Sequence, residues 1–592
     1  MKMKALKYIA VLAASSLLMF QSCISDKAFL EEHPKAMYTI DNAFETCDQV
    51  DNQLTLCYIQ LYSWFANISW GSTFQYKNFG TDVLDQPYFR GGGSGGYSNF
   101  SNWTALDSNI KQLWTESYKV ISYANLALMG CENPDILWND PVQKNRVIGE
   151  AHFFRGFSYL RLAEAYGGVP IVKKYDESTH NDYVRASRAE TYQFAIEELT
   201  AAYNGLTDYP ELEGKIGKGA AAHMLAEAYL ALGVETGDKK CYTDAADYAK
   251  KAIALHPLMT ERFGLRANPN DKGSYHGVNN YLPNGNVYSD LFTAGNFDRG
   301  TGNTEGIWVI QTATYEQGDN YGGQKISTMQ ISIVARDLNW APEYVEPAPA
   351  AAGPWKGTNH PVYGGNFSAY VGGFGIAEMA PTNWAGYDNW TDPTDLRYQE
   401  DATVRTKFLC FDQNHSLFNQ YVTREMIDPN PDCLSKFFPM FQKIIPLDDW
   451  TYRDTDFFHM NYSSDAYAIR SAETYLLLAE AYLRAGDVDN AVKTVNVLRE
   501  RAKCTDMYTT DGFDINDILD ERARELLYEE ARWFTFLRME PEVWKQRIYD
   551  HAMYWSDYKK VTTPIAWNLW PIPQDIIDLN TGAPMEQNAG WK

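Results

Sequence analysis

The sequence predicts an all-α protein in which a helical scaffold carries a large loop-rich, aromatic-rich elaboration. Long stretches with a helical hydrophobic period predict the scaffold, and two of them share the spacing of a tetratricopeptide helix pair. The absence of any sustained helical period between about residues 264 and 465 predicts the elaboration. With 592 residues, the chain is long enough to bury a large core.

The first 22 residues have the composition of an export signal. Three lysines form a basic start, and the apolar run over residues 8–20 is too short to span a bilayer as a stable helix. The small Ser22 precedes Cys23, and this ending resembles a bacterial lipoprotein box, in which cleavage frees the cysteine for lipidation. We therefore expect residues 1–22 to be removed and Cys23 to carry a stable lipid anchor. The alternative is a plain secretory signal with an incidental cysteine.

A strongly helical segment follows at VIGEAHFFRGFSYLRLAEAYGG, residues 147–168. Its larger apolar side chains fall close to one face, and a Gly-Gly pair followed by proline marks its end, so the pattern predicts one amphipathic helix. The residues on that face are Phe154, Phe157, Leu160 and Leu162.

Two later segments repeat one pattern. The first joins HMLAEAYLALG (223–233) to YTDAADYAKKAIALHP (242–257), and the second is LLLAEAYLRAGDVDNAVKTVNVLRERA (476–502). Small residues at the helix contacts and a glycine at the corner are typical of tetratricopeptide helix pairs. At least two such units are predicted, although a regular solenoid would not separate them so widely. The second unit carries the spacing at Leu478, Ala479, Tyr482, Gly486, Ala491 and Val495, and the first at Ala226, Tyr229, Gly233, Ala245, Ala249, Ala252 and Pro257.

The region between the two units is rich in glycine, proline, asparagine and aromatic residues, as in PEYVEPAPAAAGPWKGTNHPVYGGNFSAYVGGFG (342–375). Aromatic faces and amide groups are what a sugar ring needs for stacking and for hydrogen bonds to its hydroxyls. A second such surface is predicted over residues 70–103. The candidate glycan-binding residues are Tyr76, Tyr88, Trp103, Tyr315, Tyr321, Trp340, Trp355 and Trp384. The candidate groups for reading hydroxyls are Asp82, Asp85, Arg90, Asn320 and Gln324.

Four segments together resemble the SusD-like (RagB/SusD) family of outer-membrane glycan-binding lipoproteins of Bacteroidota. They are GEAHFFRGFSYLRLAEAYGGVPIV (149–172), AYAIRSAETYLLLAEAYLRAGDVDNAVKTVNVLRERA (466–502), ILDERARELLYEEARWFTFLR (518–538) and LWPIPQDIIDLN (569–580). The resemblance implies a SusD-like helical scaffold of four tetratricopeptide-like pairs. It also implies that the protein forms a lid on a SusC-like TonB-dependent transporter and captures oligosaccharides for import. Glycan-contacting residues belong to none of these motifs, so none is carried over from the family.

This resemblance implies one domain behind the signal. Residues 23–263 are expected to form an N-terminal helical part, residues 264–465 the loop-rich elaboration, and residues 466–592 the last helix pair with the C-terminal motifs. We also expect the helical repeat side, and not the aromatic loop side, to contact the transporter, because the two regions differ in composition.

The charged residues of the 518–538 motif form a cluster that could suggest catalysis. We interpret them as helix ion pairs spaced three or four residues apart, with the tryptophan packed on the scaffold. The cluster consists of Glu521, Arg522, Arg524, Glu529, Glu530, Arg532 and Trp533.

Composition argues against several other functions. The net charge of −24 and the lack of a basic stripe oppose nucleic-acid binding. The seven cysteines after Cys23 are scattered and lack a CxxC pair, so most are expected to be small buried residues. No metal or cofactor is predicted; acidic segments such as DNWTDPTD (388–395) are compatible with a structural calcium ion but lack an EF-hand pattern.

Catalytic signals are weak. GGGSGG (91–96) satisfies GxSxG and GxGxxG by repetition alone, and we interpret it as a flexible loop. The sequence therefore predicts a binding protein and not an enzyme. An all-helical surface glycoside hydrolase is the main alternative, since such folds combine tryptophan-rich clefts with paired carboxylates. A pure protein-interaction scaffold is the third, but the aromatic insert argues against it as the whole function.

Overall fold

The structure is a computed structural model, and it confirms the all-α prediction. The protein is helix-rich, and the strands described in it form short two-stranded ladders without a closed sheet. The signal segment and Cys23 lie outside the described residues. The described residues are 44–65, 78–85, 100, 103–176, 178–267, 274–275, 278–279, 285–293, 295–311, 380–400, 402–409, 420–426, 437–443, 465–552 and 564–591.

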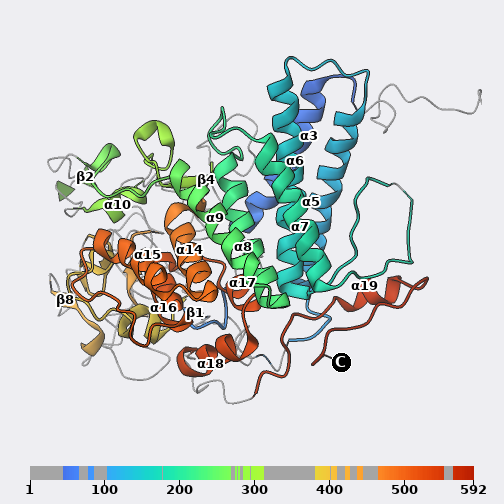
Figure 1. The fold of residues 1–592 in the computed structure, drawn as a ribbon. Helices are drawn as coiled ribbons and strands as arrows, with labels where there is room; N and C mark the ends of the chain where they lie inside the picture. The colour runs from blue at the N-terminus through green and yellow to red at the C-terminus, as the bar shows by residue number, and fades with distance from the viewer. Residues whose placement is uncertain are drawn as a thin grey trace, which may run out of the picture.

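Long helices of the N-terminal part stand side by side at one end of the molecule (Figure 1). The chain runs up and down through them, and each packs against the next in sequence. The members of this bundle are α3 (Cys47–Phe65), α5 (Ser108–Glu132), α6 (Pro141–Tyr166) and α7 (Arg188–Gly205).

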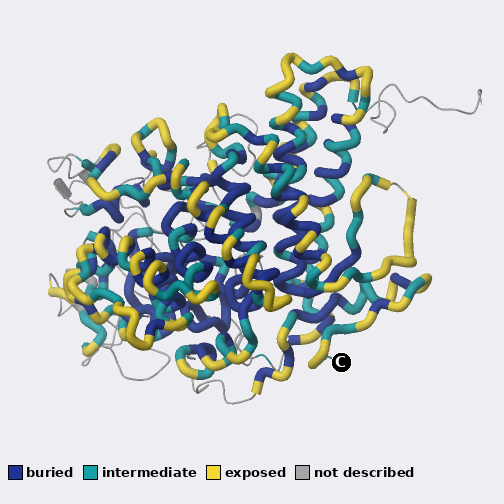
Figure 2. Tube along the Cα trace, viewed as in Figure 1, coloured by how far each residue is buried: buried dark blue, intermediate teal, exposed yellow. Residues whose placement is uncertain are grey.

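Helix α6 is the central member of the bundle. It ends at Tyr166 before the predicted Gly-Gly pair, where Gly167 takes a positive φ of 78°. Nearly every residue from Phe153 to Tyr166 is buried, because α3, α5, α7, α8 and α17 all contact this helix. The prediction of an amphipathic helix was therefore wrong: the helix is enclosed on all sides, as the dark central segments of Figure 2 illustrate.

The two predicted repeat units are helical hairpins of the same construction. Helices α8 (Lys218–Thr236) and α9 (Lys239–Leu255) are joined at Gly237, and helices α14 (Ser471–Ala485) and α15 (Val488–Arg501) are joined at Gly486. Both glycines are left-handed, as a helix C-cap requires, and an aspartate follows each one and caps the next helix.

The structure differs at Gly233, which was expected to turn the corner of the first hairpin. Helix α8 continues one turn further, and Gly233 lies inside it. A methyl group on Gly233 would lie 2.5 Å from the ring of Tyr242, so this glycine permits the close approach of the two helices. The corner itself is formed by Gly237.

The two hairpins are neighbours in space although 215 residues separate their ends in the sequence. Small and apolar residues of α8, α9 and α14 share one buried cluster, in which Ala226, Ala249 and Ala481 are fully enclosed. The loop-rich region is therefore inserted between two adjacent helical hairpins.

A strand pair joins the two ends of this insertion. Strand β4 (Gly306–Ile310) pairs antiparallel with β10 (Ala466–Arg470), and Ile310 lies opposite Ala466. The chain thus leaves and re-enters the helical scaffold at one place. The other described pairs are β1 (Leu84–Asp85) with β5 (Ala380–Pro381), β2 (Ser274–Tyr275) with β3 (Val278–Asn279), β6 (Val404–Arg405) with β9 (Met440–Phe441) and β7 (Phe408–Leu409) with β8 (Tyr421–Val422).

The C-terminal segments close the scaffold from the side opposite the top of the bundle (Figure 1). Their aromatic residues enter the main core, where Trp533, Trp544 and Trp570 are fully buried. The elements are α16 (Ile515–Leu526), α17 (Arg532–Leu537), α18 (Pro541–His551) and α19 (Gln574–Leu579); the short α10 (Val287–Leu291) precedes β4.

The charged C-terminal motif forms buried ion pairs, but most of them do not follow the predicted helix spacing. Arg524 and Glu521 are three residues apart and do pair, at 2.8 Å. Most other partners come from distant segments: Glu525 accepts from Arg470 at 2.7 Å, for example, and also pairs with Arg501. Burial makes these pairs links between segments, which a helical-wheel argument cannot show. Trp533 is packed in the core as predicted.

The described cysteines agree with the interpretation of small buried residues. Cys47, Cys57, Cys131 and Cys241 are buried and unbridged, and Cys504 is half-buried. Burial raises the pKa of the Cys131 thiol to about 12, so it is protonated and unreactive at neutral pH. Cys410 and Cys433 lie outside the described residues.

Candidate ligand-binding surface

The strand pair β1–β5 brings two of the predicted candidate regions together. Leu84 lies opposite Pro381, and Asp85 opposite Ala380, so the first loop region meets the segment that carries Trp384. The hydroxyl of Thr382 reinforces the junction: it donates to the Asp82 carbonyl at 2.7 Å and accepts from the Ala385 amide at 3.1 Å. Regions some 300 residues apart in sequence are thus neighbours.

Trp384 begins a single π-helical turn, η6 (Trp384–Asp388), and its side chain is half-buried. Its ring stacks on His551 with centroids 4.3 Å apart and planes 24° from parallel. The guanidinium carbon of Arg547 lies 4.8 Å from the ring centroid. Two side chains of α18 therefore fix the orientation of the indole.

The charge state of His551 supports this stacking. Burial lowers the pKa of His551 below its ordinary value, and the neighbouring Arg547 lowers it further. The imidazole is consequently neutral at pH 7 and stacks on Trp384 without the cost of desolvating a charge.

Asp82 supports the surface from within and does not face it. It is fully buried, and its two carboxylate oxygens accept from Arg532 at 2.8 and 2.6 Å and from Arg547 at 2.7 Å. Burial alone would raise its pKa, but the two guanidinium groups lower it to about 2. Asp85 is also buried, at 1% exposure. The prediction that these two aspartates bind sugar hydroxyls was therefore wrong, because neither reaches solvent.

Trp103 is the other correction. Its side chain is only 5% exposed, and its ring stacks on Trp567 at 5.5 Å inside the aromatic core. The rings of Phe100, Trp533 and Trp570 lie within 6.0 Å of it. A ring enclosed in this way has no face for a sugar, so the structure removes Trp103 from the candidate glycan contacts.

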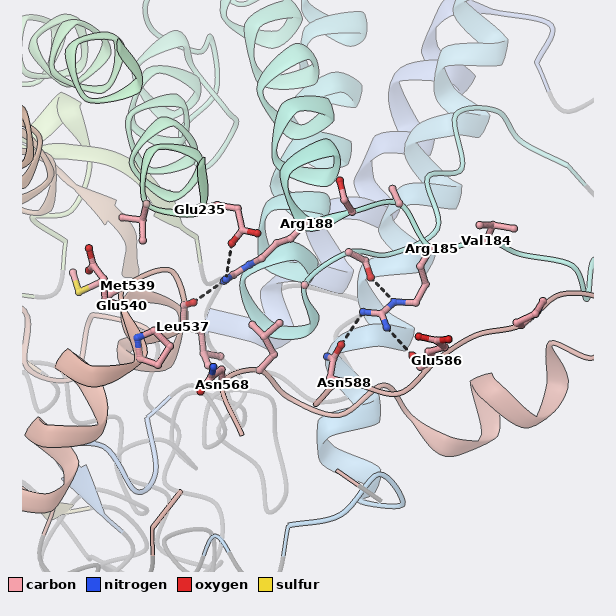
Figure 3. Close-up of a pocket in the computed structure, with 18 residues that line it drawn as sticks. Val184, Arg185, Arg188, Glu235, Leu537, Met539, Glu540, Asn568, Glu586 and Asn588 are labelled. Atoms are coloured by element: carbon pink, nitrogen blue, oxygen red, sulfur yellow. Dashed lines mark hydrogen bonds and ion pairs between the residues drawn. The ribbon is translucent and has the colours of Figure 1, made fainter. Parts of the chain in front are cut away.

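A separate open groove of about 730 Å³ lies where the ends of α6, α7, α8 and α17 meet the C-terminal segment (Figure 3). Arg188 in its wall binds Glu235 at 3.2 Å and the Leu537 carbonyl at 2.6 Å. Arg185 donates to the carbonyls of Gly168 and Glu586, both at 2.7 Å. These contacts hold the C-terminal segment in place. None of the described residues that line the groove is aromatic, so it offers no stacking platform.

The described acids of the groove do not form a catalytic pair. Glu235 is occupied by Arg188, and Glu540 accepts from Arg484 at 2.8 Å. Burial would raise the pKa of Glu540, but Arg484 lowers it below its usual value, so it is not held protonated as a general acid. Within the described ranges no three His, Cys, Asp or Glu side chains are placed to hold a metal ion.

Comparison with known families decides the classification. Residues 438–591 match the SusD family model, and residues 23–230 match the model described as "Starch-binding associating with outer membrane". The two matches together cover more than half of the chain and include both ends of the helical scaffold. The chain belongs to the SusD-like family.

Curated SusD-like relatives are distant in sequence. "SusD-like protein P2" of Formosa agariphila is 23% identical over 531 residues, covering 86% of this chain and 87% of that protein. A "SusD-like protein" of Bacteroides ovatus is 26% identical over 223 residues, covering 37% of this chain and 38% of that protein.

Solved SusD-like structures share the fold. A SusD homolog from Bacteroides thetaiotaomicron superposes with a TM-score of 0.65 at 19% identity, covering 93% of this chain and 98% of that one. The surface glycan-binding protein A from Bacteroides fluxus gives a TM-score of 0.60 at 18% identity, covering 92% and 99%. At these identities the likeness establishes the fold alone. In the part of this SusD-like chain that the structure describes, no helix is long and apolar enough to cross a membrane.

The remaining candidates of this SusD-like protein lie outside the described residues, so the predictions about them stand as predictions. They are Tyr76, Tyr88, Tyr315, Tyr321, Trp340 and Trp355 among the aromatic residues, and Arg90, Asn320 and Gln324 among the polar ones.

Sequence reasoning missed three groups beside Trp384. Arg424 lies 4.3 Å from the ring centroid of Tyr387 and donates to Asn383 at 2.9 Å. The aromatic run NWAGYDNW (383–390) could have drawn attention to Tyr387. His551, in contrast, lies at the end of a helix 167 residues from Trp384, and no local pattern indicates its contact.

Proposed function

We propose that this protein is a non-catalytic cell-surface lipoprotein that binds oligosaccharides and passes them to a SusC-like TonB-dependent transporter. The observation that carries the proposal is the fixed, half-buried ring of Trp384 at the β1–β5 junction. An indole held in one orientation loses little conformational entropy when a sugar ring stacks on it.

Names in the comparisons support a carbohydrate ligand. One matching family model is described as starch-binding, and one structural relative is named a surface glycan-binding protein. The aromatic candidates outside the described residues flank the two strands that meet at this junction. We propose that they extend the platform begun by Trp384. They are Tyr76, Tyr88, Tyr315, Tyr321, Trp340 and Trp355.

The proposed location is the outer membrane, with the chain anchored at the cell surface through a lipid on Cys23. The family description "associating with outer membrane" supports this location. A Cys23→Ser variant should be released from the membrane fraction, whereas the parent chain should remain in it. Retention of the variant in washed membranes would contradict the lipid anchor.

We further propose that the helical repeat side contacts the transporter. A photo-crosslinking residue at exposed Lys251 on α9 or Val497 on α15 should then capture the transporter in cell membranes. Crosslinks from residues 380–400 without any from α9 or α15 would instead place the transporter on the aromatic side.

The binding function is tested by isothermal titration of residues 24–592 against a panel of plant and host oligosaccharides. Reducing-end release is assayed in the same samples. Heat of binding without new reducing ends, diminished in Trp340→Ala or Trp355→Ala, is the expected result. New reducing ends would make the protein a glycoside hydrolase.

A further inference from the structure

The corner between α5 and α6 presents apolar side chains to solvent at the top of the bundle (Figure 1). Leu137 is 86% exposed, more than any other large apolar residue in the described structure, and Val142 is 56% exposed. Trp138 lies half-buried beside them. An exposed apolar tip of this kind marks an interaction surface.

The corner is a built feature of the fold. Asp140 caps α6 by accepting from the Gln143 amide at 2.8 Å, and Pro141 occupies the first turn of that helix. Ile136, the neighbour of Leu137, is buried in the main core at 5% exposure. The backbone is therefore held on both sides of Leu137, and the leucine side chain is left pointing away from the core.

The membrane-proximal end of the chain reaches the bundle at this same corner. Phe44, the first described residue, packs against the last turns of α5: a methyl group on Gly130 would lie 2.9 Å from the ring of Phe44. Gly130 is two residues before the end of α5 at Glu132. The residues between Cys23 and Phe44 can span no more than about 75 Å at full extension. A lipid on Cys23 would therefore hold this corner, and not the α19 end, nearest to the bilayer.

We propose that the α5–α6 corner rests on the lipid surface and inserts Leu137 and Val142 into it. The inference depends on the lipid anchor of the proposed function. A bilayer interface suits the chemistry of the corner: two aliphatic tips would enter the acyl boundary, and tryptophan prefers the headgroup level. The ammonium of Lys144 lies 5.8 Å from the Trp138 ring centroid, and its long side chain can reach headgroup phosphates.

Charge around the corner selects the kind of lipid. The exposed acids Glu132, Asp135 and Asp140 surround it, against the single base Lys144. They would repel an anionic surface at low salt, so we expect the contact to favour zwitterionic headgroups. Contact through this corner would orient the bundle axis toward the membrane and hold the Trp384 face away from it.

The test uses the lipidated full chain in phosphatidylcholine vesicles that contain brominated acyl chains. A fluorophore is attached at Leu137→Cys in a Cys410→Ser, Cys433→Ser background, because the other cysteines after Cys23 are buried or half-buried. The matched control is Leu579→Cys on α19, which is 69% exposed at the other end of the molecule. Quenching at position 137 should exceed that at position 579 at least twofold.

Hydrogen exchange of the unlabelled chain provides a second measurement. Residues 136–142 should exchange more slowly on phosphatidylcholine vesicles than in detergent. Flotation with the vesicles but equal quenching at both positions, or unchanged exchange, would overturn this inference alone. Shielding of residue 137 only when the transporter is present would also overturn it, in favour of a protein partner. A chain that does not float would overturn the lipid anchor and this inference together.

Discussion

Asp82 and Arg532 lie 450 positions apart in the chain and form a two-bond ion pair with both side chains fully buried. Arg547 binds the same carboxylate at 2.7 Å. One aspartate thus ties the first loop region to α17 and α18, and it places the strand pair that carries Trp384. The position of the candidate surface depends on an interaction that no ligand touches.

Asp82→Asn should therefore destabilise the protein strongly. The substitution leaves two buried guanidinium groups without their acid, and breaking such a pair costs about 3–5 kcal/mol. Urea unfolding at neutral pH measures the loss. The control is Asp244→Asn, which removes the partner of the exposed Lys240 and should cost less than about 1 kcal/mol. Equal losses in the two variants would contradict the structural role of Asp82.

The same pair predicts a pH dependence. Its folded-state pKa of about 2 lies below the ordinary value of 3.8. The stabilisation is therefore fully present above the ordinary value and is lost as the pH falls toward about 2. Asp82→Asn should flatten the acid limb of the stability curve.

Glu164 predicts the opposite sign. Arg161 donates to Glu164 at 2.7 Å and to Glu227 at 2.8 Å, so one guanidinium is shared between two buried carboxylates. Burial raises the pKa of Glu164 above the ordinary 4.5, and the neighbouring Glu227 raises it further, against the effect of Arg161. The folded state then holds a proton that the unfolded state loses, and stability falls as the pH rises through that window.

Glu164→Gln should remove this decline. Its free energy of unfolding should gain on the parent between about pH 5 and about pH 8, by at most roughly 1.4 kcal/mol per pH unit. Urea titrations at both pH values measure the difference. Glu132→Gln, which changes an exposed acid, should run parallel to the parent. A parallel curve for Glu164→Gln would mean that the buried site holds no extra proton.

Trp384→Ala should weaken oligosaccharide binding by roughly 3- to 10-fold, the effect of losing one aromatic stacking partner. His551→Ala should weaken it less, because the indole stays but loses the partner that orients it. Isothermal titration against the best ligand of the panel measures both. Trp138→Ala, a half-buried tryptophan at the other end of the molecule, should bind as the parent does. Unchanged affinity in Trp384→Ala would exclude this ring from the site.

Gly168→Ala should cost about 2 kcal/mol or more. Its methyl group would lie 1.8 Å from the Ala186 carbonyl oxygen, a backbone atom that pairs with the same segment and cannot move alone. Thermal unfolding measures the change. Gly237→Asn is the matched control, because that corner has a φ of 73° but open space around it, and asparagine tolerates this conformation. Comparable losses would mean that Gly168 is not sterically required.

The sequence predicted those features that are set locally. The glycine stop after α6 and the hairpin corner at Gly486 follow from backbone conformation, and the buried cysteines follow from general burial preferences. Gly233 was misplaced because local spacing cannot tell a corner from a close helix contact, and only the position of Tyr242 distinguishes them.

The candidate site was predicted less well because its composition depends on distant partners. Trp103 and Trp384 are both tryptophans in irregular segments, yet one is enclosed by C-terminal rings and the other is half-buried at a junction. The sequence around each does not contain that difference. The same holds for Asp82, whose role is defined by arginines more than 400 residues away.

The pairing of Ile310 with Ala466 also bears on how this architecture can change. Because the two ends of the intervening segment are held side by side by scaffold strands, its length and sequence can be exchanged without moving any helix of the frame. A hybrid that carries the corresponding segment of another SusD-like protein, joined at these two positions, should fold on this frame and acquire the ligand preference of the donor. The strand pair is in that sense a socket, and evolution can refit it for a new nutrient in a single recombination event.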